Sequence, residues 1–454
     1  MASIIAAVAQ VKDELTKFLS PESIQRCMDE HGYTWRDRQL DPVTTIQLFA
    51  QQVLHGNVSC REVRQLAEGD KRFSGSAYCQ ARSRLPLEAL QTLVRRIGDA
   101  ALRATDEDDP RWHGHRVRTT DGSGISMPDT PELQAHFGQH GMQKPGCGFP
   151  IAHTLAQFHA GTGLLVDIVA SPLRTHDMAK VPDLIGHVEA NDVILGDCAF
   201  CTYAHFALLL RRGAHGVFPN HQKRIIDFTP GRKHVHPSSG KSQNKKGRPR
   251  SRWVRELGRE DQIVEWFKPA ERPSWMTRED YDALPPSIHV RELRRKVLRA
   301  DGRTVYVTLV TTLLDGECYP ADELVKLGES RWAVEVNLRH LKTTMGMDVL
   351  RCKNVKGVMK ELTIYALVYN LVRVVMLEAA RRQQMPVDRV SFIDAYTWLR
   401  HAPVGEHLPR LVTHRRRPGR LEPRVLKRRK DTYSYMTRPR DELRNALKYQ
   451  GVPP

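Results

Sequence analysis

Apolar residues recur at helical spacing through the first part of the chain, up to about residue 110. Helix-start signals punctuate this stretch, in the form of capping residues and early prolines: Ser20-Pro21, Asp41-Pro42, Ser59 with Glu62, Ser76 and Pro86. The polar break "DEDDP" (106–110) then interrupts the pattern. Residues 1–110 are therefore predicted to form an all-helical N-terminal domain.

The hydrophobic period changes to alternation from residue 111 onward. In "RVRTTDGSGISMPDTPE", Val117, Thr119 and Asp121 fall on one face of a predicted strand. Two more strands, over 153–160 and 163–171, are expected to follow it as an antiparallel meander.

A short apolar run comes after a predicted helix over 176–188. Residues 193–195 in "DVILGDCAF" have the pattern of a central strand buried on both faces, and this strand ends just before Asp197. A helix over 202–213 and a strand at "HGVFPN" complete the series.

This order of elements predicts an α/β fold, a ribonuclease-H-like mixed sheet with flanking helices, with its first part over residues 111–220. In open α/β sheets, functional sites gather at the carboxyl ends of neighbouring strands. Asp121 and Asp197 are expected to lie close together for this reason.

Residues 221–320 are predicted to interrupt the sheet with a β-rich insertion. Strand-like patterns cover 261–269, 287–299 and 303–314. The stretch 231–252 is basic and poor in apolar residues, so we expect a loop that is mobile or becomes ordered on nucleic acid.

A helix is expected over "ESRWAVEVNLRHLKTTMGMDVLR" (329–351), with Ser330 as its cap. Four charged residues on it have the spacing of one helix face: Arg331, Glu335, Arg339 and Lys342. A charged face of this kind is most often only solvated, so the pattern alone does not establish a site.

A second, longer helix is predicted over 356–382, where it would pack on the sheet and complete the core over residues 321–400. Its most apolar part, 362–377, is too short to span a bilayer. No signal peptide is evident, and the eight cysteines show no disulfide framework. We therefore expect a cytoplasmic, nucleoid-associated protein.

The net charge of +18 predicts a polyanionic partner, and nucleic acid is the commonest one. Arginines and lysines are spread over the N-terminal helices, where DNA binding and an ordinary charged exterior are equally good interpretations. The C-terminal segment, 401–454, is strongly basic from Thr413 onward, which is typical of a nucleic-acid-binding tail or of a solvated arm.

Three carboxylates from separate segments, Asp121, Asp197 and Glu335, could together hold two hard divalent cations. Two Mg²⁺ ions, or Mn²⁺ in their place, would activate a water or a 3′-hydroxyl and stabilise the leaving oxygen in phosphodiester cleavage and strand transfer. Other acidic residues compete for this role on spacing alone: Asp129, Asp167, Asp177, Asp192 and Asp348.

Three segments carry a resemblance to a known family: "TTDGSGISMPDTPE", "VILGDCAF" and "RWAVEVNLRHLKTTMGMDVLRCKNVKGVMKELTIYALVYNLVR". They resemble the transposases of bacterial insertion sequences in the insertion sequence 4 family, which are DDE enzymes on a ribonuclease-H-like core. The resemblance covers roughly residues 121–373 and includes a β-rich insertion between the second Asp and the Glu.

The resemblance implies that Asp121, Asp197 and Glu335 are the metal-binding catalytic residues. The family signature Tyr-x2-Arg-x3-Glu-x6-Lys is matched by Arg331, Glu335 and Lys342. Arg331 and Lys342, together with the neighbouring Arg339, are then expected to contact DNA phosphates.

The signature is not complete, because Gly328 stands where the family has Tyr. The missing ring and hydroxyl are expected to alter how the nucleotide beside the cut is held. On this interpretation, Gly328→Tyr leaves activity unchanged or raises it.

The resemblance further implies cut-and-paste transposition, in which the protein binds terminal inverted repeats, cleaves the DNA and joins it to target DNA. A hairpin on the transposon end is one route that the family allows. The expected partners are double-stranded DNA and a second copy of the chain in the DNA-bound complex. Trp253, Trp266 and Trp275 could stack on a flipped base, although packing is the commoner role of tryptophan.

Two other functions remain open: a catalytically inactive, transposase-derived DNA-binding protein, and a ribonuclease-H-like nuclease that cuts without joining strands. The joint presence of three carboxylates argues against the first function. The long basic flanking segments favour recognition of DNA ends and argue against the second.

Overall fold

The computed structural model describes residues 20–36, 38–67, 73–105, 111–235, 247–298, 304–401, 407–411, 436 and 438–449. Most of the predicted basic loop, over 236–246, lies outside these residues. The same is true of the basic stretch 413–430 in the C-terminal segment.

The N-terminal region is helical, as predicted, and its helices are α3 (Pro21–Glu30), α4 (Pro42–Leu54), α5 (Val63–Leu66), α6 (Gly75–Arg84) and α7 (Leu87–Thr105). Ser20 and Asp41 cap α3 and α4 through hydrogen bonds to backbone N–H groups at the third position. Ser59 and Glu62 bond reciprocally, at 3.2 and 3.4 Å, which confirms the capping box. The helix expected from Ser76 starts one residue earlier, with Ser74 as its cap.

Of these helices, α3, α4 and α7 share one hydrophobic core with α14 (Val355–Arg382) and α15 (Phe392–His401), whereas α5 and α6 pack in a smaller cluster against α4. Arg82 of α6 belongs to this junction, because its guanidinium lies 3.7 Å from the centre of the Phe49 ring and donates to Gln52 and Cys352. Lys360 of α14 donates in turn to the carbonyl oxygen of Ser83. Arg82 therefore serves packing, and it is not exposed for contact with DNA.

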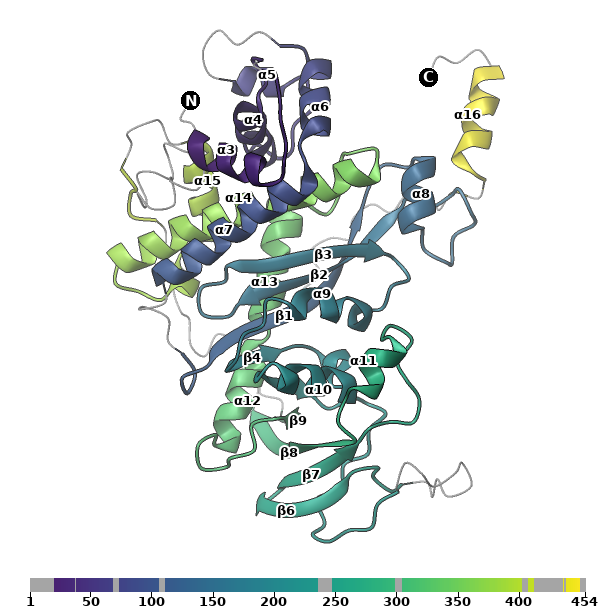
Figure 1. Ribbon diagram of the computed structural model, residues 1–454, viewed down its shortest axis with the longest axis vertical. Helices are drawn as coiled ribbons and strands as arrows, with labels where there is room; N and C mark the ends of the chain where they lie inside the picture. Colours follow the sequence, from purple (N-terminus) through teal and green to yellow (C-terminus); the bar gives the residue numbers. More distant parts are fainter. Residues whose placement is uncertain are drawn as a thin grey trace.

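Nine strands form one sheet in the described part of the chain: β1 (Arg116–Ser126), β2 (Ile151–His159), β3 (Leu165–Pro172), β4 (Asp192–Leu195), β5 (His215–Pro219), β6 (Arg252–Gly258), β7 (Asp261–Phe267), β8 (Ser287–Leu298) and β9 (Thr304–Thr311). Their order is β3-β2-β1-β4-β5-β9-β8-β7-β6, as can be followed in Figure 1. The first three strands are the predicted antiparallel meander, and β4 and β5 continue it in parallel with β1. The predicted ribonuclease-H-like mixed sheet is confirmed.

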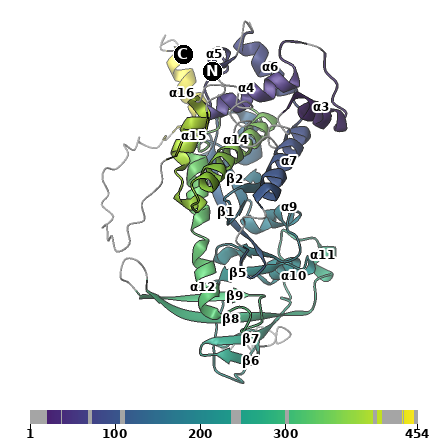
Figure 2. The ribbon, with the colours of Figure 1, turned by 90° about the vertical axis from the view of Figure 1, so that its left-hand side faces the viewer.

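Helices cover both faces of this sheet. Ile194 of β4 packs with α9 (Val181–Ile185) and α10 (Tyr203–Arg211) on one face. Val193 and Leu195 point the other way and pack with α12 (Ala321–Ser330). Figures 1 and 2 show α12 on the opposite side of the sheet from α9 and α10. Both faces of β4 are thus buried, as its apolar run predicted.

The strands of the β-rich insertion extend the same sheet beyond β5. β9 pairs with β5 in antiparallel register, from Val217 with Thr311 to Pro219 with Leu309. The remaining insertion strands add to β9 one after another. β6 was not predicted, because most of this edge strand is exposed and its sequence "RWVRELG" does not alternate between buried and polar positions.

The remaining elements are short or peripheral. Four of the described helices were not predicted as separate elements: α8 (Pro131–Phe137), α11 (Arg278–Asp282), α15 and α16 (Arg440–Tyr449). The 3₁₀ turns are η1 (Asp177–Lys180), η2 (Cys198–Phe200) and η5 (Val387–Arg389). α16 is joined to the body by Arg440, whose side chain donates to Asp129 at 3.0 Å.

One helix in the described residues, α14, is long and apolar enough to cross a membrane. Nearly all of its apolar stretch is buried inside the protein, where it forms the centre of the largest core. The prediction of a buried core helix at this position is confirmed.

The helix that was expected from Glu329 to Arg351 is not a single regular helix. α12 ends at Ser330, whose hydroxyl donates to the Leu327 carbonyl instead of capping a new helix. α13 (Ala333–Arg339) follows, and then a π-helical turn, η4 (His340–Thr344). The expectation that Ser330 caps the helix was wrong, because helical dihedral angles continue through Arg331 and Trp332.

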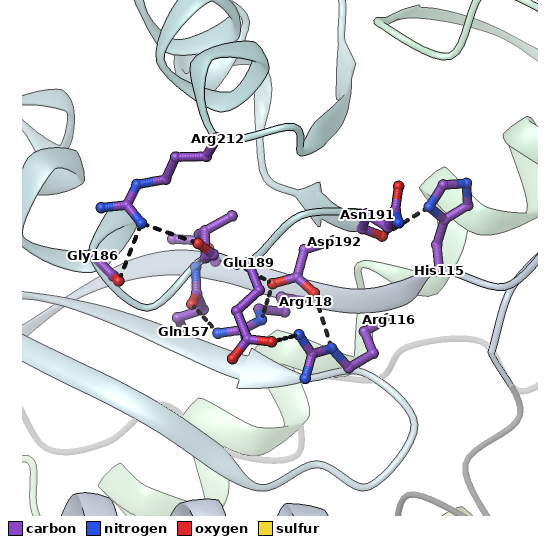
Figure 3. A network of polar contacts seen from close by, with 11 residues as sticks. His115, Arg116, Arg118, Gln157, Gly186, Glu189, Asn191, Asp192 and Arg212 are labelled. Atoms are coloured by element: carbon purple, nitrogen blue, oxygen red, sulfur yellow. Dashed lines mark hydrogen bonds and ion pairs between the residues drawn. The ribbon is translucent and has the colours of Figure 1, made fainter.

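A buried ionic network joins β1 to β4 (Figure 3). Asp192, which is completely buried, accepts a hydrogen bond from Arg116 at 3.0 Å and forms an ion pair with Arg118 at 2.9 Å. Arg118 also donates to Gln157 of β2 at 3.2 Å. The network therefore spans three adjacent strands, and it fixes their register from inside the sheet.

We predict that Asp192→Ala lowers the free energy of unfolding by about 3–5 kcal/mol, because it leaves two arginines without their buried counter-charge. Glu189→Ala is the matched control, since Glu189 pairs with Arg116 from an exposed position and should cost at most about 1 kcal/mol. Urea unfolding followed by circular dichroism measures both values. Equal losses in the two variants would contradict a structural role for the buried charge.

Candidate active site

The parallel register of β1 and β4 brings two of the predicted catalytic residues to the same level. Thr119 is paired with Leu195 at the end of the ladder. Asp121 and Asp197 each lie two residues further along the chain. Both carboxylates thus belong to the carboxyl edge of the sheet, where sites of α/β proteins gather.

Backbone N–H groups hold one oxygen of each of these two carboxylates. Asp121 Oδ1 accepts from Gly122 N at 2.8 Å. Asp197 caps the 3₁₀ turn η2, and its Oδ1 accepts from Ala199 N at 2.8 Å. Both side chains are therefore oriented by local backbone geometry before any ligand binds.

Glu335, on α13, reaches the same edge through an arginine. The guanidinium of Arg331 lies between two carboxylates, with Nη1 3.7 Å from Asp121 Oδ2 and Nη2 3.7 Å from Glu335 Oε1. The Arg331 side chain is only 15% exposed, whereas that of Glu335 is 45% exposed. Residues more than 200 positions apart are thereby joined in one charged cluster.

The electrostatics of Asp121 reflect this cluster. Burial raises the pKa of the Asp121 carboxyl above its ordinary value, and the negative charges of Asp197 and Glu335 add to the increase. The Gly122 N–H group and the Arg331 guanidinium act in the opposite direction. The site thus holds an excess of negative charge that a bound cation would relieve.

The helical segment around Glu335 is overwound up to this residue and underwound after His340. Backbone N–H groups of Trp332 and Glu335 bond to carbonyls three residues earlier, whereas Met345 N bonds to His340 O, five residues earlier. Such π-helical turns occur frequently at functional sites. Here the irregularity sets the angular positions of the charged residues that follow Glu335.

Two contacts fasten this helical segment to β1. Lys342, in the π-helical turn, donates to Ser123 Oγ at 2.8 Å. Beyond the turn, Ser126 exchanges backbone hydrogen bonds with Asp348 and Leu350. Arg339, the third predicted DNA-binding residue, is exposed on α13. Arg331 therefore contacts Asp121, and Lys342 contacts Ser123 two residues further along β1. Arg339 faces solvent.

No group of three or more metal-ligating side chains is already gathered tightly enough to hold an ion, as far as the described residues show. The donor set nevertheless fits a hard divalent cation, because Asp121, Asp197 and Glu335 offer only carboxylate oxygens. The contact of Arg331 with two of these carboxylates shows that a positive charge is already accommodated among them.

Comparison with known proteins places the chain in a family. Residues 112–371, more than half of the chain, match the family model described as "Transposase DDE domain". The chain belongs to the DDE transposases. It is 26% identical over 377 residues to "Transposase InsG for insertion sequence element IS4" of Escherichia coli (strain K12). The aligned residues cover 81% of this chain and 77% of that protein. The predicted insertion sequence 4 family is confirmed.

Among solved structures, the transposase is similar to one titled "Cryo-EM structure of piggyBac transposase synaptic complex with hairpin DNA (SNHP)". The TM-score is 0.41 and the sequence identity is 11%, with 88% of this chain and 80% of the other covered.

The competing aspartates of the transposase have other partners or positions, apart from one. Asp129 pairs with Arg440, Asp167 with His187, and Asp192 with the two β1 arginines. Asp348 is exposed, and only its backbone contacts β1.

Asp177 is the exception, and no pattern in the sequence distinguished it from the other aspartates. Its carboxylate pairs with His153 of β2 at 3.1 Å and lies directly against Gly122, next to Asp121. Burial raises the Asp177 pKa, and the charge of Asp197 adds to this increase. A fourth carboxylate therefore lies against Gly122, the residue of β1 whose N–H group orients Asp121.

The tryptophans named as candidates for base stacking are buried or partly buried, in keeping with the packing role that is commoner for this residue. Trp266 is buried under the Arg224 guanidinium and donates to Glu292, so it is unavailable to a flipped base in this conformation. Trp253 and Trp275 are partly buried. Trp332 was not considered, although it is 54% exposed and lies less than one helix turn from Glu335. Its position beside Arg331 in the signature could have pointed to it.

Gly328, the departure from the family signature, has a packing explanation. A Cβ atom there would lie 3.1 Å from Leu309 Cδ1 and 3.3 Å from Cδ2. The position thus faces β9. A tyrosine ring at this position would displace Leu309, so we no longer expect Gly328→Tyr to be neutral or beneficial.

We predict that Gly122→Ala impairs the site, because the new Cβ would lie 2.7 Å from Asp177 Oδ1. Overpacking of this kind costs about 1–3 kcal/mol and would shift the N–H group that orients Asp121. Gly124→Ala, two residues along the same strand, meets only Ile151 at 3.5 Å and is the matched control. Urea unfolding and metal-dependent nicking of plasmid DNA should separate the two variants; equal behaviour would exclude a role for the Asp177 contact.

Proposed function

We propose that this transposase is catalytically active, that it binds the terminal inverted repeats of an insertion sequence, and that it performs metal-dependent cleavage and strand transfer. The observation that supports the proposal is the cluster at one sheet edge. Asp121 and Glu335 share the Arg331 guanidinium. Asp121 and Asp197 each follow the last pair of the β1–β4 ladder, Thr119 with Leu195, by two residues.

In this proposal Asp121, Asp197 and Glu335 hold two Mg²⁺ ions, with Mn²⁺ as a possible substitute. When bound, the ions would supply an activated water or 3′-hydroxyl and charge stabilisation for the leaving oxygen. The backbone N–H groups of Gly122 and Ala199 orient two of the carboxylates. The Glu335 side chain is 45% exposed, against 21% for Asp121 and 15% for Arg331, so it can adjust when DNA enters.

DNA would be held by the cations next to these carboxylates. Lys342 and Arg331 flank Asp121 on the side facing α13, and Arg339 extends the same charge along the helix. The net charge of +18 favours association with the phosphate backbone. Cut-and-paste transposition by a homodimer, in a bacterial cytoplasm, is the setting that we propose.

We predict that Asp121→Asn, Asp197→Asn and Glu335→Gln each abolish cleavage while preserving DNA binding, because each substitution removes a ligand charge and keeps the shape. Asp348→Asn is the control, since Asp348 is exposed and only its backbone contacts β1, at Ser126. The measurement is Mg²⁺-dependent nicking of supercoiled plasmid, with binding followed by gel shift. Retained cleavage in any of the three variants would remove that residue from the catalytic set.

A strand-transfer assay with a precleaved transposon end tests the second half of the proposal. Joined products that require Glu335 would support a transposase. Hydrolysis without joining would instead identify a nuclease, and DNA binding without either reaction would identify an inactive binding protein.

We predict that Lys342→Ala reduces the slope of log K against log salt concentration by about 0.9 for binding to the end DNA, since one phosphate contact is lost. Ser123→Ala should leave the slope unchanged, because it removes the hydroxyl that Lys342 contacts but keeps the charge. Fluorescence anisotropy across a salt series measures both. An unchanged slope for Lys342→Ala would mean that Lys342 does not contact phosphate.

A further inference from the structure

Arg331 occupies an unusual place for a residue that is expected to contact DNA. Its guanidinium fork points inward, toward Asp121 on β1 and Glu335 on α13, and not toward solvent. Only 15% of the side chain is exposed. This cation is therefore directed at the same carboxylate oxygens that a metal ion would need.

The site requires a positive charge in order to be stable. Asp121, Asp197 and Glu335 affect one another electrostatically, and Asp121 is largely buried, where repulsion between like charges is screened less than in water. Arg331 supplies the counter-charge within the described part of the site. It also bridges a strand and a helix that are far apart in sequence, so it holds both carboxylates at the sheet edge.

The two contacts of Arg331 are long, which makes them easy to replace. Both N···O distances are 3.7 Å, beyond the 2.7–2.9 Å that is typical of a charge-assisted hydrogen bond. Two ion pairs between almost fully buried partners are tighter: Arg118 lies 2.9 Å from Asp192, and Arg291 lies 2.6 Å from Asp261. Arg331 therefore neutralises its partners without being locked to them.

The Arg331 guanidinium already lies over an aromatic face that continues toward solvent. Its Cζ atom is 5.3 Å from the centre of the Trp332 ring, and Trp332 is 54% exposed. Arginine stacks favourably on aromatic faces. A rotation about the side-chain bonds of Arg331 could thus carry its charge out of the carboxylate cluster and toward solvent, where DNA phosphates would lie.

We propose that Arg331 is a positioning residue that acts as an internal counter-cation: it holds Asp121 and Glu335 in place before metal ions bind, and the metal ions displace it. Resting on the function proposed above, this assigns Arg331 two successive partners, first the carboxylates and then a DNA phosphate. Metal loading and phosphate binding are then coupled, because the same movement permits both.

The proposal predicts that removing this arginine tightens metal binding. Mn²⁺ affinity is measured without DNA by electron paramagnetic resonance titration of the full chain. Arg331→Ala should bind Mn²⁺ about tenfold more tightly than the unsubstituted protein, since no guanidinium competes for the two carboxylates. The same variant should bind end DNA more weakly, because its phosphate contact is lost.

Two further variants separate competition from a general charge effect. Arg331→Lys keeps the charge but lacks the fork that can contact both carboxylates, so it should also bind Mn²⁺ more tightly. Lys326→Ala removes an exposed charge from α12 and should change Mn²⁺ affinity less than twofold. Thermal unfolding of each variant confirms that the fold is intact.

The outcomes distinguish this inference from the proposed function. If Arg331→Ala and Arg331→Lys bind Mn²⁺ no more tightly than the unsubstituted protein, while Asp197→Asn abolishes binding, the metal site stands and the counter-cation role is overturned. Tightening in Arg331→Ala alone would overturn it too, because charge and not displacement would then explain the effect. If no variant binds Mn²⁺ and Asp197→Asn changes nothing, both proposals fail.

Discussion

The parallel pairing of β1 with β4 is the constraint on which the site depends. It places Asp121 and Asp197 at the same level of the sheet, and the buried contact between Arg118 and Asp192 keeps the two strands from slipping. A slip of one residue would turn every side chain of a strand to the other face, so a charge that is costly to bury here secures the position of a carboxylate of the candidate site several residues away. Stability and chemistry are therefore linked through one register.

The sequence allowed the sheet and two of its acidic residues to be predicted, for physical reasons. Short apolar runs and alternation mark strands regardless of what they pack against, and the loop after such a strand lies at the sheet edge. The helix of Glu335 was predicted less well, because its overwound and π-helical turns depend on contacts of Lys342 and Leu350 with β1 that no local pattern encodes. Asp177 was not singled out for the same reason. Its carboxylate lies in η1, and only the folded structure brings it against Gly122 of β1.

Positive charge in this protein does not all serve the same purpose. Arg82 joins the N-terminal helices to the core, Arg118 is part of the sheet network, and Arg291 pairs with buried Asp261 inside the insertion. Each of these arginines is buried or nearly so and already has acceptors. Counting basic residues therefore overestimates the surface that can meet DNA, whereas Arg331, Arg339 and Lys342 form a small set beside the carboxylate cluster.

The antiparallel pairing of β9 with β5 has a mechanical consequence. Because the insertion is continuous with the catalytic sheet through backbone hydrogen bonds, it cannot swing about a hinge between Asp197 and Glu335 in the way that a domain on a flexible linker could. Any large deformation needed to fit a distorted duplex against this edge would have to come from the nucleic acid itself. A stiff protein platform of this kind would make the bendability of the DNA ends part of what is recognised.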